Sequence, residues 1–132
     1  MSPSPEEIQA RVTKTVAEAL EKDVADVRPS SSLVDDLGAE SIDFLDILFR
    51  IESDFDIKIQ GDEIWKGELD LANADPAAFE SGLATLRERM PDFPWDRFQE
   101  GIQKKDLRRL ITVQTIVDFL TRTLAKEGER TA

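Results

Sequence analysis

The chain has 132 residues, enough for one compact core and too few for two ordinary domains. It contains no His, Cys or Tyr, which excludes Cys/His zinc sites, thiol nucleophiles, His-based acid–base catalysis and disulfides. The net charge is -11, and residues 1–64 carry most of it, with 6 basic against 16 acidic side chains. We therefore expect partner proteins with basic surfaces and no nucleic acid.

The first helix is predicted over residues 5–21, after a short flexible tail (residues 1–5) that has none of the features of a signal peptide. Ser4 is suited to cap this helix and Pro5 to its first position. Its apolar stripe repeats every four residues: Ile8, Val12, Val16 and Leu20. No segment has the apolar length needed to cross a bilayer, so we expect no membrane insertion. Without a signal peptide as well, we expect a cytoplasmic protein, and we expect it to be a monomer.

Residues 22–38 form a predicted long loop, because they contain Pro29, three consecutive serines and Gly38. A loop of this length in a compact domain is usually functional or well anchored. Its candidate anchors into the core are apolar: Val24, Val27, Leu33 and Leu37.

The next predicted helix begins at Ser41 and carries two apolar stripes. One contains Phe44, Leu48, Ile51 and Phe55, and the other contains Ile42, Leu45 and Phe49. If one stripe faces the core, the other lies at the surface beside acidic residues, as in a helix that docks proteins. A helix packed on both sides by a larger core is the alternative.

Three further helical regions follow. Asp75 and Pro76 open a helix that Pro91 ends, and a shorter helical turn is expected after Pro94. Thr112 caps a last helix, which Gly128 and a flexible tail (residues 127–132) are predicted to end. The alternation at residues 55–59 is too short for a sheet, so the fold class is all-α.

Residues 33–42, LVDDLGAESI, resemble the signature of acyl carrier proteins, as do the first helix and the ITVQ at residues 111–114. The resemblance covers residues 6–64 and 110–125 and implies a single carrier domain. Its expected fold is the four-helix bundle of acyl carrier proteins, with one or two additional helices in an insertion at about residues 65–109.

The resemblance implies that Ser41 accepts 4'-phosphopantetheine from coenzyme A, with Gly38, Glu40 and Ile42 beside it. Two positions depart from the family pattern, since Glu40 stands for the usual Asp and Ile42 for the usual Leu. Physical chemistry favours the same place, because the positive end of a helix dipole attracts a phosphodiester. No group in the chain would activate the Ser41 hydroxyl as a catalytic nucleophile, so we expect a carrier and no enzyme, with no metal site.

The partners implied are a phosphopantetheinyl transferase and acyl-loading, acyl-transfer or ketosynthase enzymes with basic docking patches. The residues implied to dock them are Ile42, Asp43, Leu45, Asp46, Phe49 and Glu52. The pathway would be fatty acid, lipid or polyketide-type biosynthesis. Two other functions stay open: a peptidyl or aminoacyl carrier, and an unmodified helical adaptor.

The insertion has three interpretations. It enlarges the core, it lines a cavity for the acyl chain, or it offers a partner surface through the KKDLRR cluster at residues 104–109, which could instead fold back on the acidic helix. A general fatty acid carrier needs no such addition. The insertion therefore favours a specialised carrier.

Overall fold

The computed structural model describes residues 3–60, 63–65 and 70–131, with side-chain surroundings described through Lys126. Residues 1–2 and 132 of the predicted tails, and residues 66–69 of the predicted insertion, lie outside this description. In the described ranges the structure is helical and contains no strand, which confirms the all-α class. None of the helices in these ranges is both long and apolar enough to cross a membrane.

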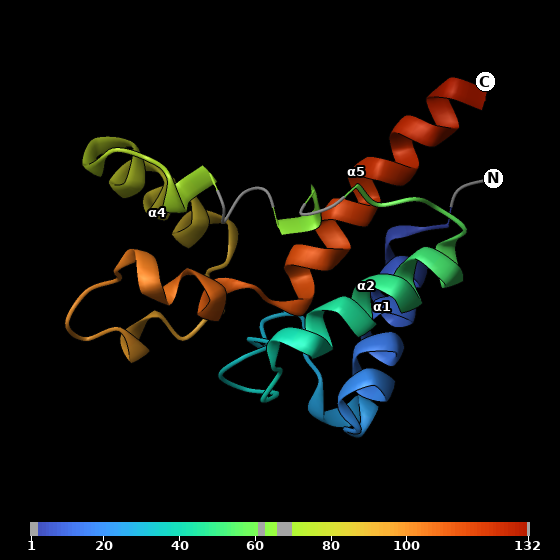
Figure 1. The fold of residues 1–132 in the computed structure, drawn as a ribbon, viewed down its shortest axis with the longest axis horizontal. Helices are drawn as coiled ribbons and strands as arrows, with labels where there is room; N and C mark the ends of the chain where they lie inside the picture. Colours follow the sequence, from blue (N-terminus) through green and yellow to red (C-terminus); the bar gives the residue numbers. More distant parts are fainter. Residues whose placement is uncertain (1–2, 61–62, 66–69, 132) are drawn as a thin grey trace.

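The carrier part is a bundle of the long helices α1 (Pro5–Leu20), α2 (Ser41–Phe55) and α5 (Val113–Thr131). Figure 1 shows α1 and α2 side by side, with α5 running from the base of the bundle out past them. The short 3-10 turn η2 (Glu63–Trp65) contacts α5. This arrangement confirms the predicted bundle of acyl-carrier type.

One apolar face of each helix builds the first core. Helix α1 begins as predicted, because the Ser4 hydroxyl accepts a hydrogen bond from the Glu7 N–H at 3.1 Å. The largest side chains of this core with almost no exposed surface are Val12, Val16, Leu33, Ile47, Ile51, Val113, Ile116 and Leu120. Burial of these faces, rather than helix propensity alone, stabilises helices of this length.

The predicted loop contains a single 3-10 turn, η1 (Val24–Asp26), and is anchored at its second half. Val27, Leu33 and Leu37 are buried as predicted. Val24 is 54% exposed, so its prediction as an anchor is wrong. It lies within η1, and the apolar residue that follows this turn, Val27, enters the core instead.

Backbone contacts join the loop to the start of α5. Ser32 and Thr112 form an isolated antiparallel bridge, and the Leu33 N–H donates to the Ile111 carbonyl at 3.0 Å. The buried Ser32 hydroxyl donates to the Arg109 carbonyl at 2.7 Å. The loop at Ser32 and Leu33 is therefore held against the residues just before α5.

The insertion forms a body of its own beside the bundle (Figure 1). It contains α4 (Pro76–Arg89) and the 3-10 turns η3 (Trp95–Arg97) and η4 (Lys104–Leu110). The Asp75 carboxylate caps α4 by accepting from the Ala78 N–H at 2.8 Å, which confirms the predicted helix start.

The buried apolar residues of this body form a second core: Phe79, Leu83, Phe93, Ile102, Leu107 and Leu110. The interpretation that the insertion enlarges the first core is therefore wrong for these residues. Half-buried Trp65 is the exception, since it packs on the first core, where the centroids of the Trp65 and Phe44 rings are 5.4 Å apart.

Helix α5 continues through Gly128 to Thr131, so the predicted helix end at Gly128 is wrong. Glycine inside a helix costs about 1 kcal/mol relative to alanine, which lowers helix stability without forcing an end. A glycine ends a helix where the chain turns into the left-handed conformation, and here the backbone remains helical on both sides.

Candidate functional site

Ser41 is the first residue of α2 and its side chain is exposed. The residue that caps the helix is Glu40, whose carbonyl accepts from the Phe44 N–H at 3.3 Å. The Asp43 carboxylate in turn accepts from the Glu40 N–H at 2.8 Å. Because its neighbours perform the capping, the Ser41 hydroxyl is left for another role.

Gly38 provides the turn that leads from the loop to Ser41. Its φ is +70°, in the left-handed region that residues with a Cβ adopt only at a cost. A Cβ at this position would meet nothing within 4 Å, so the requirement for glycine is conformational rather than steric. Buried Leu37 and Ala39 anchor the chain on either side of the turn. The chain thus turns sharply at Gly38, three residues before α2 begins.

Helix α2 buries one of its predicted stripes and exposes the other. Leu48, Ile51 and Phe55 are buried in the first core, and Phe44 is half-buried against it. The other stripe is open to solvent, with exposed fractions of 71% for Ile42, 54% for Leu45 and 62% for Phe49. Within the described residues no element covers this face, so the alternative of a helix packed on both sides is wrong.

The acidic residues predicted beside this stripe also have structural contacts. Asp46 accepts from Arg50 Nε at 3.1 Å, one turn along the helix. Glu52 is half-buried, and its carboxylate accepts from the Ile59 N–H at 2.8 Å. Asp43 and Glu52 thus stabilise the two ends of α2 through bonds to backbone N–H groups. Asp46 differs from them, because its contact is with the Arg50 side chain.

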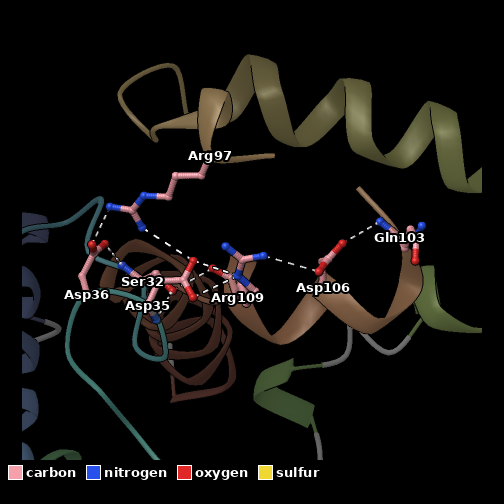
Figure 2. Close-up of polar contacts among 7 residues, drawn as sticks. All are labelled: Ser32, Asp35, Asp36, Arg97, Gln103, Asp106 and Arg109. Carbon is pink, nitrogen blue, oxygen red and sulfur yellow. Dashed lines mark hydrogen bonds and ion pairs between the residues drawn. The ribbon is translucent and has the colours of Figure 1, made fainter. Parts of the chain in front are cut away.

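A cluster of ion pairs joins the loop before Ser41 to the insertion (Figure 2). Arg97 pairs directly with Asp36 and lies 3.7 Å from Asp35. Arg109 Nε donates to both carboxylate oxygens of Asp35 at 2.9 Å, and its Nη1 lies 3.4 Å from Asp106. We name these five residues the seam cluster.

The seam cluster changes the ionisation of two of its members. Burial raises the pKa of Asp36, but hydrogen bonds from Arg97 and the Ser32 N–H, together with the charge of Arg97, outweigh burial and lower this pKa below its ordinary value. The hydrogen bond to Asp36 raises the pKa of Arg97. Both shifts favour the charged pair.

A hollow of about 380 Å³ opens beside Ser41, between the end of the loop and η4. Its walls include Glu40 and Ser41 on one side and Lys105, Arg108 and Arg109 on the other. Arg108 Nη2 lies 3.4 Å from Ser41 Oγ. The basic cluster at residues 104–109 thus folds back on the start of α2, an outcome that the sequence left as one alternative.

The predicted residues around the attachment site come together, since Gly38, Glu40, Ser41 and Ile42 occupy the turn and the first residues of one helix. The sequence did not reveal that Arg108 reaches Ser41 across 67 positions. The available signal was a run of basic residues in an otherwise acidic chain. No group of three or more potential metal-ligating side chains gathers in the part of the chain that the structure describes.

Comparison with known proteins agrees with this geometry. A family model described as the phosphopantetheine attachment site matches residues 10–72, which include the loop, Gly38 and α2. An acyl carrier protein from Desulforapulum autotrophicum is 43% identical over 60 residues, or 45% of this chain and 78% of that protein.

Two proteins named acyl carrier protein AcpXL are also similar. The one from Mesorhizobium japonicum is 45% identical and the one from Rhizobium etli 49% identical, each over 49 residues, or 37% of this chain. The chain spans about half the length of these two relatives, 53% of each. No solved structure gives a significant match.

The helical bundle and the matched attachment region define a carrier protein that bears a covalent phosphopantetheine and is not an enzyme. The chain belongs to the acyl carrier protein family. Residues 73–109, which hold α4 and the basic cluster, lie outside the matched region.

Proposed function

We propose that Ser41 is the residue that accepts 4'-phosphopantetheine, and that the chain carries acyl groups as thioesters on this arm. The observation that carries the proposal is the exposed Ser41 hydroxyl at the first position of α2, at the end of a turn that Gly38 makes. Glu40 holds the N-cap position and Asp43 accepts from the Glu40 N–H, so Ser41, at the first helical position, is not the capping residue.

The chain receives the arm but does not install it. In the transfer, Ser41 Oγ forms a bond to the phosphorus next to the pantetheine of coenzyme A, and the adenosine bisphosphate leaves. The transferase accepts the hydroxyl proton, because this chain has no His and offers no evident base to Ser41. The unpaired N–H groups and the dipole of α2 favour the phosphodiester that results.

The exposed stripe of α2 is the proposed docking surface for the transferase and for acyl-loading, acyl-transfer or ketosynthase enzymes. Ile42, Leu45 and Phe49 supply apolar area that a partner can bury, and their exposure supports this role. Asp46 supplies negative charge for basic residues on the partner, which affects the association rate more than the affinity.

An acyl cargo is favoured over an aminoacyl cargo because the relatives are named acyl carrier proteins and because the docking helix is acidic. The insertion supports a specialised carrier for fatty acid, lipid or polyketide-type biosynthesis. Its second core lies apart from the first, and its basic turn η4 borders the attachment site. These features add to the bundle rather than replace any part of it.

Incubation of the apo protein with coenzyme A and a broad-specificity transferase tests the proposal. We expect the intact mass to increase by one phosphopantetheinyl group, and Ser41→Ala to abolish the increase. Ser53→Ala changes another exposed serine of α2 and is the matched control, which should be modified normally. An unmodified wild-type chain, in a reaction where a second carrier is modified, contradicts the proposal and favours the adaptor function.

A further inference from the structure

Arg108 and Lys105 differ from the other basic residues near Ser41 in their charge environment. Arg97 and Arg109 are neutralised within the seam cluster by Asp35, Asp36 and Asp106. In the described part of the chain, no carboxylate lies within ion-pair distance of Arg108 or Lys105, and both line the hollow beside Ser41. The hollow therefore carries two positive charges that form no ion pair with the described residues.

Arg108 is exposed, and two contacts orient its guanidinium. Its guanidinium lies over the Phe44 ring at 5.3 Å and donates to Ser41 Oγ at 3.4 Å. The turn that carries Arg108 is itself fixed, because Leu107 and Leu110 are buried in the second core. A guanidinium positioned in this way loses little freedom when it binds an anion.

From this geometry we infer that the insertion provides an intramolecular phosphate clamp: Arg108 and Lys105 bind the phosphodiester of the arm on Ser41, in the hollow that they line. The inference rests on the proposed attachment at Ser41. A phosphodiester joined to Ser41 Oγ places its unesterified oxygens two bonds beyond an atom that Arg108 already reaches. A guanidinium matches two such oxygens with two parallel N–H groups.

The clamp also offsets an unfavourable charge. The Glu40 carboxylate lines the same hollow and would repel the phosphate, whereas the two cations opposite it attract the phosphate. With its phosphate held, the arm leaves Ser41 towards η4 and the insertion rather than along the exposed stripe of α2. The insertion thereby restricts the directions from which the arm presents its cargo, while Ile42, Leu45 and Phe49 stay open to partners.

Phosphorus NMR of the modified protein tests the clamp, because the arm contributes its own phosphorus signal. The protein is loaded with coenzyme A and a transferase, and the variants are Arg108→Gln and Lys105→Gln. The matched control is Arg89→Gln, which removes the same charge from an exposed position at the end of α4. The spectra are recorded from about 0.01 M to about 1 M NaCl, over which the Debye length falls from about 30 Å to about 3 Å.

We expect the wild-type and Arg89→Gln signals to shift with salt, and the shift to be lost in Arg108→Gln and reduced in Lys105→Gln. The Arg108 Hε resonance of labelled wild-type protein should also move on modification, a test that needs no variant. A signal independent of salt and an unmoved Arg108 resonance overturn the clamp alone. If the wild-type chain gains no mass in the loading reaction, the proposed function fails and the clamp fails with it.

Discussion

Asp36 and Arg97 show how single residues connect the two bodies of the molecule. The folded protein lowers the pKa of Asp36, so the pair contributes stability above the unfolded pKa, near 3.8, and this contribution is lost as the pH falls through the lower folded value. The charged form is therefore the stable one at neutral pH.

We predict that Arg97→Gln lowers the free energy of unfolding by about 1 kcal/mol at pH 7, as expected for a partly exposed charged hydrogen bond. The difference should vanish at a pH below the folded pKa of Asp36, where the carboxyl is protonated in both proteins. Urea denaturation as a function of pH measures the effect, with Arg89→Gln as control. A difference that persists in acid would show that Arg97 acts through packing instead.

At this scale the sequence predicts some contacts and misses others. Ser41, Gly38 and Glu40 are close in the chain, so a short motif is enough to place them together. Arg108 reaches Ser41, and Arg109 reaches Asp35, only after the insertion has folded. These pairs are 67 and 74 positions apart in the chain, so no local sequence pattern indicates them. The basic cluster alone is equally compatible with a free partner surface.

Helix α2 has two faces with different physical roles, and substitutions separate them. Phe49 is exposed and Leu48 is buried, although they are adjacent in the chain. Truncation of a buried leucine removes apolar contacts and leaves a cavity, whereas truncation of an exposed phenylalanine does neither.

We predict that Phe49→Ala changes the free energy of unfolding by less than about 0.5 kcal/mol, whereas Leu48→Ala lowers it by about 2–5 kcal/mol. Phe49→Ala should nevertheless lower kcat/KM of the transferase reaction, because the proposed docking surface loses its aromatic residue. Denaturation curves and initial rates measure the two effects. Modification of Phe49→Ala at the wild-type rate would remove Phe49 from the docking surface.

For the acidic residues of α2, too, a structural role has to be distinguished from a role in docking. Charge reversal at Asp46 breaks only its pair with Arg50, so it reports on docking. Charge reversal at Glu52 also removes the acceptor of the Ile59 N–H, and its expected effect includes lost stability. Reversal of Glu52 is therefore not expected to leave the fold intact, and Asp46 is the cleaner position for a test of docking.

The helices themselves follow from sequence patterns. Ser4 and Asp75 cap their helices, Pro5 and Pro76 follow at the first helical position, and the apolar spacing places each buried face. The pattern fails at Gly128, because a glycine that often ends a helix lies here in backbone that stays helical. It also fails at Val24, because tertiary contacts bury Val27 and leave Val24 exposed.

At the scale of the whole molecule, the residues that the structure describes form two apolar cores, connected by the seam cluster and by the backbone contacts around Ser32 and Thr112. Composition predicts a single domain. The aromatic side chains of the insertion are expected to be buried, but the sequence does not show which residues they pack against. The second core arises because Phe79, Leu83 and Phe93 pack with Leu107 and Leu110 of the same segment.

We predict that Phe93→Ala opens the insertion while the bundle stays folded. Truncation of a buried phenylalanine costs about 3–5 kcal/mol, which exceeds what a small core can tolerate locally. Hydrogen exchange should show lost protection in α4 and η4, with protection in α1 and α5 retained. Equal loss in all four would mean that the two cores unfold as one cooperative unit.

The attachment of the arm to Ser41 is the central claim, and peptide mapping of the modified protein tests it most directly. After co-expression with a transferase, the phosphopantetheinyl mass should lie on the peptide that contains Ser41, and fragmentation should place it on that serine. Location of the mass on any other residue, or its absence from every peptide of the recovered protein, would contradict the account.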